Sequence, residues 1–231
     1  MATATKDRVR AFATDFDGTI AHHGQVPEVA LAGLEQLRKA GIKVLLVTGR
    51  EIQDLSRVFP QLNRFDMIVG ENGALLYSPQ DQVSQLLAEA PPTNFVDRLI
   101  AHGVGPISVG NVIVATWEPH QAAVLEVIRE MGLDHQIIFN KGAVMILPAS
   151  VNKASGLEAA LHHFKISPAE TVAVGDAEND RAMLEFCRFP VAVANALPAL
   201  KERAKYVTQA ERGEGVAELI QMILKPEFKL P

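Results

Sequence analysis

The sequence Asp15-Phe16-Asp17-Gly18-Thr19 follows directly on a short apolar run at residues 11–13, which predicts the end of a buried strand. Two carboxylates two positions apart in an extended segment point the same way. The glycine then allows a sharp turn, and a hydroxyl follows it. Two acids that face one point repel each other unless a cation or a shared proton lies between them. This arrangement is costly for a fold and useful for chemistry.

The composition is that of a globular protein without marked charge. Of 231 residues, 48% are hydrophobic and 21% are charged, which fits one or two domains with a substantial core. The net charge of −5 argues against a nucleic-acid partner, and no basic cluster suits an anionic membrane. A single cysteine, Cys187, excludes an intrachain disulfide and fits a reducing compartment. Residues 1–10 are polar and no apolar run approaches roughly 20 residues, so we expect a cytoplasmic protein and no membrane partner.

Strand and helix patterns alternate along both ends of the chain. Strands are predicted at 9–14, 43–48, 67–69, 74–77, 171–174, 190–193 and 206–207. Helices are predicted at 26–40, 51–59, 153–164, 178–186, 198–204 and 215–224. Such alternation indicates an α/β fold, a doubly wound parallel sheet with helices on both faces and a Rossmann-like core.

The middle of the chain has a different pattern. Helices are predicted at 93–101 and 119–131, and strands at 107–117, 136–140 and 144–147. The last two strands would form a hairpin around Asn140-Lys141-Gly142. We therefore expect residues 1–79 and 153–231 to form the catalytic core, and residues 80–152 to form a small inserted α+β cap domain with exposed linkers.

Three further motifs are expected at the sheet edge where the two acids lie. Thr48-Gly49 ends a strand and precedes a helix, which predicts a phosphate site or a simple helix cap. Lys153 begins a helix, where its charge is unfavourable unless an anion lies nearby. The run Gly175 to Asp180 brings further acids, with a capping role as the alternative.

The residue types favour magnesium over other metals. Carboxylate oxygens with retained waters suit Mg²⁺, and no Cys or His cluster has the spacing of a zinc site. The Gly-x-x-x-x-Gly-Lys loop of one large class of nucleotide hydrolases is also missing.

In their order and spacing, these four motifs resemble those of the haloacid dehalogenase superfamily of phosphohydrolases. The insert resembles the type IIB cap of its Cof-like branch, and Glu71-Asn72-Gly73-Ala74 before the insert is also typical of that branch. The short cap resembles that of small phosphoglycolate phosphatases, and also that of sucrose-phosphate and mannosyl-phosphoglycerate phosphatases.

The resemblance implies a role for each motif. Asp15 would be the nucleophile that forms an aspartyl-phosphate, and Asp17 would move protons to the leaving alcohol and from water. The phosphate or substrate contacts would be Thr48, Gly49, Lys153 and Asn179. Mg²⁺ would be held by Asp15, Asp17 through its backbone carbonyl, Asp176 and, directly or through water, Asp180.

We therefore expect a Mg²⁺-dependent phosphomonoester hydrolase that acts on a small phosphorylated metabolite such as phosphoglycolate or a sugar phosphate. The alternatives are a phosphomutase similar to phosphomannomutase and a phospho-accepting signalling domain. The sequence leaves open whether the protein is a monomer or a dimer.

Other residues are expected to do less. Trp117, near the end of a cap strand, is predicted to pack in a core rather than to contact substrate, and Met145 is predicted to fill a core. Lys141 reads as a polar turn residue, with contact to an anionic substrate as the alternative. Glu71 and Asn72 are expected to serve their turn.

Overall fold

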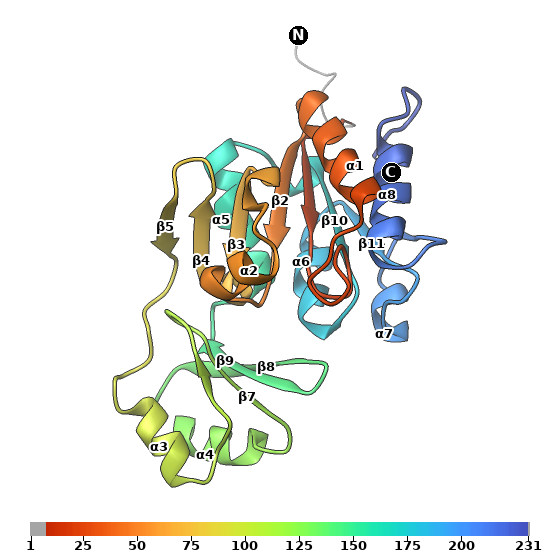
Figure 1. The fold of residues 1–231 in the computed structure, drawn as a ribbon. Coiled ribbons are helices and arrows are strands. Elements are labelled where there is room, and N and C mark those ends of the chain that lie inside the picture. Colours follow the sequence, from red (N-terminus) through yellow and green to blue (C-terminus); the bar gives the residue numbers. More distant parts are fainter. Residues whose placement is uncertain (1–7, 231) are drawn as a thin grey trace.

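The protein folds around two β-sheets of different size (Figure 1). The structure, a computed structural model, describes residues 8–230. The larger sheet has the strand order β12-β11-β10-β1-β2-β3-β4-β5, and the smaller has the order β6-β7-β9-β8. The described residues leave out residues 1–7 and 231, which lie at the two ends of the expected core. Most of the polar stretch before residue 10 is therefore outside the described residues.

Most strands of the larger sheet are parallel. The parallel strands are β1 (Ala11–Thr14), β2 (Lys43–Val47), β3 (Met67–Gly70), β10 (Thr171–Gly175), β11 (Phe189–Ala192) and β12 (Tyr206–Val207). Every residue of β1, β3, β10 and β11 is buried, so these apolar runs are covered on both faces. The predicted α/β fold with a doubly wound parallel sheet is confirmed.

Helices cover both faces of this sheet. They are α1 (Glu28–Lys39), α2 (Ile52–Val58), α5 (Lys153–Phe164), α6 (Arg181–Phe186), α7 (Pro198–Lys201) and α8 (Arg212–Ile223). Helix α1 packs beside α8 and α5 packs beside α6, and Figure 1 shows α1 in front of the sheet and α5 behind it. In α1 the buried residues Leu31, Leu34 and Leu37 recur at helical spacing, which directs one face toward the sheet. No helix within residues 8–230 has both the length and the apolar character needed to cross a membrane.

One edge of the larger sheet is antiparallel. It is formed by β4 (Leu75–Ser78), which pairs with β3, and by β5 (Val83–Leu86), which pairs with β4. Residues 83–86, which the sequence pattern assigns to the insert, therefore extend the larger sheet. All four residues of β5 are exposed, so hydrophobic periodicity does not predict this strand. The strand forms because it pairs with β4 across a tight turn.

The smaller sheet is antiparallel throughout. Its strands are β6 (Ser108–Val109), β7 (Val114–Trp117), β8 (His135–Asn140) and β9 (Ala143–Pro148). Helices α3 (Phe95–Ala101) and α4 (Gln121–Glu130) cover the face that is turned away from the larger sheet (Figure 1). The hairpin predicted around residues 140–142 is confirmed. The single strand predicted at 107–117 is wrong, because residues 110–113 form a loop between β6 and β7.

Candidate active site

Side chains from three neighbouring strands meet at one edge of the larger sheet. Asp15 directly follows β1, Thr48 follows β2 and Asp176 follows β10, and these strands lie side by side in the order β10-β1-β2. All three side chains are buried. Ligands of open α/β sheets bind outside the carboxyl ends of the strands. The predicted convergence of these motifs at one edge is therefore present.

Lys153 supplies the positive charge of this cluster. Its Nζ lies 2.5 Å from Asp15 Oδ1 and 2.6 Å from Asp180 Oδ1, and its side chain is 1% exposed. Burial alone would lower the pKa of Lys153, but the two carboxylates outweigh it and raise the pKa above its usual value. A lysine at the start of a helix needs a nearby anion, and here the carboxylates of Asp15 and Asp180 both meet that need.

The start of α5 is determined by local sequence. The Asn152 side chain accepts hydrogen bonds from the N–H groups of Ala154 and Ser155, and the Ser155 hydroxyl bonds back to Asn152. A cap of this type is worth about 1 kcal/mol. Gly73 packs against the same cap with a φ of +112°, and a Cβ there would lie 2.0 Å from the Asn152 carbonyl oxygen. Only glycine allows this approach, which sets where Lys153 enters the site.

Asp180 organises the loop that follows β10. Its Oδ2 accepts hydrogen bonds from the backbone N–H groups of Asp176 and Ala177, at 2.8 and 3.0 Å. A Cβ on Gly175 would lie 2.6 Å from Asp180 Cβ, so this position also requires glycine. Across the site, the Thr19 hydroxyl donates to Asp176 Oδ1 at 2.9 Å. The acidic loop and the Asp15-to-Thr19 segment are therefore joined directly.

The acidic cluster is suited to a divalent cation. One oxygen from each of Asp15, Asp176 and Asp180 lies within 4.8 Å of the others. Burial, with the Asp180 charge adding to it, raises the pKa of Asp15 from 3.8 to about 8, and burial also raises the pKa of Asp176. When all three are ionised, these carboxylates around one buried lysine carry excess negative charge. Hard oxygen donors with that excess fit a metal ion such as Mg²⁺ or Ca²⁺.

The Asp17 side chain lies outside this cluster. Both of its oxygens accept hydrogen bonds from Arg50, at 2.6 Å from Nε and 2.9 Å from Nη2, and Arg50 also pairs with Asp54. The Asp17 backbone carbonyl lies on the cluster side, 3.3 Å from the ammonium group of Lys141. The backbone of Asp17 thus faces the predicted metal ligands, while its carboxylate is turned toward Arg50.

The predicted phosphate contacts Thr48 and Gly49 follow β2, and Asn179 lies in the loop after β10. The Thr48 hydroxyl accepts a hydrogen bond from the Arg50 N–H at 3.1 Å, and Gly49 faces the Met145 sulfur from the other sheet. The Asn179 amide donates to the Asn72 side-chain oxygen at 3.1 Å. The Asn72 amide nitrogen is buried without a hydrogen-bond partner, which leaves one donor of this pair available.

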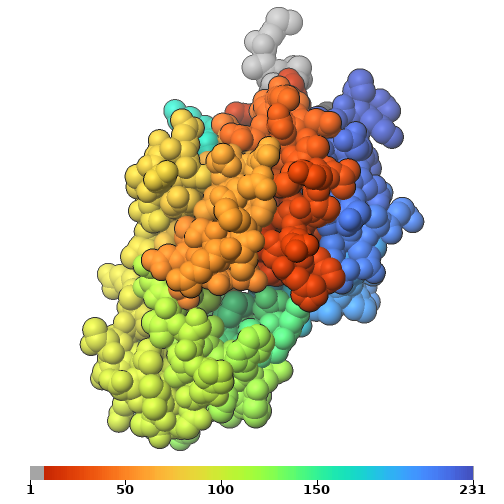
Figure 2. Space-filling model, viewed as in Figure 1, coloured from red at the N-terminus to blue at the C-terminus, as the bar shows by residue number. Residues whose placement is uncertain are grey.

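A pocket of about 560 Å³ lies between the two sheets, where Figure 2 shows the parts of the molecule that carry them meeting along a crevice. The side of the larger sheet contributes Asp15, Asp17, Thr48, Gly49, Arg50, Glu51, Gln53, Asp54 and Arg57. The side of the smaller sheet contributes Ser108, Ile113, Ala115, Asn140, Ala143 and Met145. One wall is therefore strongly charged, and the other is neutral.

Glu71 has a role that its turn motif did not predict. Its carboxylate is fully buried and accepts hydrogen bonds from the backbone N–H groups of Asn111, Val112 and Ile113 and from the Asn111 amide, at 2.7 to 3.0 Å. These bonds explain why residues 110–113 leave the strand. Because Ile113 lines the pocket, Glu71 positions part of its neutral wall. The sequence feature that could have indicated this role is an acid placed between an apolar strand and the turn residues Asn-Gly.

Trp117 is the clearest error among the side-chain expectations. It is 54% exposed, although its sequence context predicts that it packs in a core. Along β7, Val114 and Thr116 are buried toward the helices, and Trp117 pairs with Ala143 on the opposite face. Strand alternation therefore places Trp117 beside the pocket wall. Met145 is buried as predicted, but it also lines the pocket.

Comparison with known proteins gives the family. The model of the haloacid dehalogenase-like hydrolases matches residues 12–103 and 111–220, and the chain belongs to this family. A phosphoglycolate phosphatase of Methanothermobacter thermautotrophicus is 32% identical over 229 residues, which cover 94% of this chain and 99% of that protein. A phosphoglycolate phosphatase of Archaeoglobus fulgidus is 29% identical over 226 residues, or 93% of this chain and 96% of that protein.

Solved structures agree on the fold. A Thermoplasma acidophilum protein superimposes with a TM-score of 0.80 at 18% identity, over 94% of this chain and 98% of that chain. A sugar phosphatase of haloacid dehalogenase subclass IIB superimposes with a TM-score of 0.74 at 21% identity, over 92% of this chain and 98% of that chain. The predicted resemblance to this superfamily is confirmed, and the protein is a phosphatase.

Proposed function

We propose that this phosphatase is a Mg²⁺-dependent phosphomonoesterase that works through an aspartyl-phosphate intermediate on a small phosphorylated metabolite. The observation that carries the proposal is the buried Asp15–Lys153–Asp180 arrangement beside a pocket of about 560 Å³. It places a carboxylate, a fixed cation and an acidic cluster around one point. Phosphoglycolate is the first candidate substrate, because relatives at 32% and 29% identity are phosphoglycolate phosphatases.

Asp15 is the proposed nucleophile. Lys153 binds its Oδ1, and its Oδ2 accepts no hydrogen bond within residues 8–230, although the residue lines the pocket. Attack by this carboxylate forms an oxygen–phosphorus bond while the bond from phosphorus to the leaving alcohol oxygen breaks. Water then attacks the same phosphorus atom, which releases inorganic phosphate and restores the Asp15 carboxylate.

Asp17 is the proposed proton carrier. It would protonate the leaving alkoxide and then accept the proton of the attacking water. Its side chain is 41% exposed and held by Arg50, so it must leave Arg50 to reach the leaving group. A phosphate dianion that enters the pocket competes with Asp17 for the Arg50 guanidinium, which would release the carboxylate as substrate binds.

The proposed phosphate contacts are Thr48, Gly49, Lys153 and Asn179. The Lys153 ammonium is fixed by two carboxylates and needs no reorganisation to face the transferring group. Gly49 brings backbone N–H groups close to the pocket without a side chain in the way.

The proposed Mg²⁺ ligands are the side chains of Asp15 and Asp176 and the backbone carbonyl of Asp17. Both oxygens of Asp180 are already hydrogen-bonded, so we propose that it supports the metal site through Lys153 and the 176–177 backbone. When bound, the cation would offset the repulsion between the carboxylate nucleophile and the phosphate dianion.

Two further elements belong to this proposal. We propose that residues 80–152 act as a cap on a core of residues 1–79 and 153–231, apart from the strand at 83–86 that pairs in the larger sheet.

The buried, unpaired Cys187 fits a cytoplasmic enzyme.

The test is phosphate release from a panel of phosphoglycolate, hexose phosphates, sucrose phosphate and mononucleotides, with Mg²⁺ or with EDTA. We expect turnover of phosphoglycolate that EDTA abolishes and added Mg²⁺ restores. If no ester releases phosphate, the proposal is wrong. Conversion of a hexose 1-phosphate to the 6-phosphate, without free phosphate, would instead establish a phosphomutase.

A further inference from the structure

Lys141 brings a positive charge from the smaller sheet into the acidic cluster. It lies in the turn between β8 and β9 with a φ of +49°, and its N–H contacts Glu178 Oε2 at 3.4 Å. Its Nζ lies 2.6 Å from Asp176 Oδ2 and 3.3 Å from the Asp17 backbone oxygen. It is the only lysine between residues 80 and 152.

A metal ion and this ammonium group cannot share Asp176. Magnesium binds carboxylate oxygens at about 2.0–2.1 Å. The ammonium lies 2.6 Å from the same Oδ2 and contacts the same Asp17 carbonyl, both of which the proposed function assigns to Mg²⁺. Two cations on one oxygen pair repel each other at close range. Metal binding would therefore displace the Lys141 side chain while its backbone stays in the turn.

The displaced ammonium would remain at the pocket. Asn140 and Ala143, on either side of the turn, both line it, and every other lining residue from the smaller sheet is neutral. The leaving group of a substrate whose phosphorus faces Asp15 must extend toward this wall. A neutral leaving group offers the ammonium no partner, whereas a carboxylate does.

We propose that Lys141 is a specificity residue that selects substrates with a second anionic group, such as a carboxylate, on the leaving alcohol. This inference rests on the proposed function and narrows its substrate class. Another cation, Arg57 on α2, also lines the pocket and makes no ion pair among the described residues, so the experiment must separate the two.

The experiment compares kcat/KM for phosphoglycolate and for 2-hydroxyethyl phosphate, in which a neutral CH₂OH group replaces the carboxylate. We expect the wild type to prefer phosphoglycolate. In Lys141→Met, kcat/KM for phosphoglycolate should fall roughly 10- to 100-fold, as expected for a lost charged hydrogen bond, and that for the neutral ester should change less than about threefold. Lys141→Arg should keep most of the preference.

Arg129→Met is the matched control. It removes one exposed cation from the last turn of α4, on the far side of the smaller sheet from the pocket. We expect it to keep the wild-type kcat/KM for both esters. If Lys141→Met keeps the full preference for phosphoglycolate, or if Arg57→Met alone removes it, the assignment to Lys141 is overturned.

A second measurement does not need turnover. Calorimetric titration with Mg²⁺ should show tighter binding to Lys141→Met than to the wild type, because no ammonium has to be displaced. Equal affinity would overturn the displacement step. If the wild type hydrolyses other esters of the panel but neither of these two, the assignment to Lys141 is overturned and the proposed function stands. If it hydrolyses no ester of the panel, the proposed function fails, and the Mg²⁺ titration still tests the contact between Lys141 and Asp176.

Discussion

Asp15 and Asp180 both bind Lys153 through Oδ1, but they differ in the hydrogen bonds that Oδ2 accepts. Asp180 Oδ2 accepts two backbone N–H groups, so that carboxylate is fully engaged in holding the loop after β10. Asp15 Oδ2 has no hydrogen-bond partner among residues 8–230, and the residue lines the pocket. Of the two, Asp15 alone retains an oxygen that is free to react.

Replacing Asp15 with Asn should abolish turnover and leave the fold intact. The amide is a far weaker nucleophile, so we expect kcat to fall by at least about 10³-fold. The change also removes one charge from a crowded acidic cluster, so the midpoint of thermal unfolding without Mg²⁺ should not decrease.

Phosphate release and thermal unfolding should be measured on Asp15→Asn and on Asp97→Asn, which changes an exposed acid in the first turn of α3. Wild-type turnover in Asp15→Asn at saturating Mg²⁺ would rule out the nucleophile assignment.

At the scale of elements, the 3₁₀ turn Glu71–Gly73 connects the two sheets. Glu71 and Asn72 have φ values of +49° and +56°, which direct their side chains to different parts of the site. Glu71 binds the loop between β6 and β7, and Asn72 binds Asn179 beside the phosphate site. This short turn therefore links the neutral pocket wall to the catalytic edge.

Replacing Glu71 with Gln should loosen that wall. One oxygen becomes an NH₂ group that faces backbone donors, so some of the buried N–H groups at 111–113 lose their acceptor. We expect a loss of about 2–3 kcal/mol in the free energy of unfolding and a severalfold higher KM. Urea unfolding and steady-state kinetics measure both.

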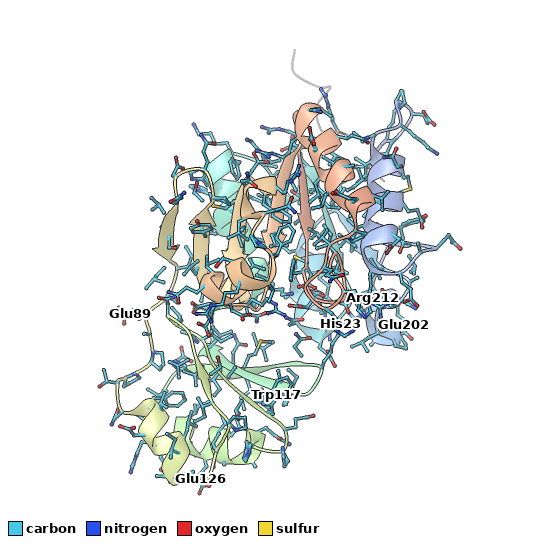
Figure 3. All side chains as sticks on the ribbon, in the orientation of Figure 1. His23, Glu89, Trp117, Glu126, Glu202 and Arg212 are labelled. Atoms are coloured by element: carbon cyan, nitrogen blue, oxygen red, sulfur yellow. The ribbon has the colours of Figure 1, made fainter. Side chains whose placement is uncertain are left out.

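Glu89→Gln is the control, an exposed acid on the connection toward the smaller sheet that Figure 3 labels. Unfolding midpoints that agree between Glu71→Gln and Glu89→Gln would show that the buried contact contributes nothing.

Trp117, labelled in Figure 3, should report on the pocket wall. It is the only tryptophan, it is 54% exposed, and its neighbour Ala143 lines the pocket. We expect orthovanadate with Mg²⁺ to reduce quenching of its fluorescence by acrylamide. The same additions to Asp15→Asn should have a weaker effect. Identical quenching with and without orthovanadate would place Trp117 outside the influence of the site.

At the scale of the whole molecule, stability depends on the protonation of the acidic cluster. The pKa of Asp15 is raised to about 8 and that of Asp176 is also raised, so the fold favours their protonated forms. The stability that these two groups contribute is present below their unfolded-state pKa and is lost as pH rises, and for Asp15 this loss runs from about pH 4 toward about pH 8. A divalent cation favours the ionised forms and reverses this loss.

Mg²⁺ should therefore raise the thermal unfolding midpoint more at about pH 8 than at about pH 5, where it must displace protons. Differential scanning calorimetry with and without Mg²⁺ at both values is the measurement, with NaCl of equal ionic strength as the control. An equal rise at both pH values would mean that protons and the metal do not compete at this cluster.

Where the chain follows strong local rules, its elements were predictable. Helix α5 begins at Lys153 and ends at Phe164 as expected, because a capping asparagine precedes an amphipathic segment. Strand β5 and the break between β6 and β7 were not predictable. They depend on pairing with β4 and on the Glu71 carboxylate, neither of which leaves a periodic pattern in the local sequence.

The sequence by itself determined the α/β class, the order of the elements and which acids follow which strands, because periodicity and caps act over a few residues. Only the tertiary structure decided that Arg50 holds Asp17, that Glu71 holds residues 111–113 and that Lys141 reaches Asp176. It also turned Trp117 outward beside the pocket. These contacts join residues 33 to 42 positions apart, and their partners are chosen by sheet order, strand alternation and packing rather than by local sequence.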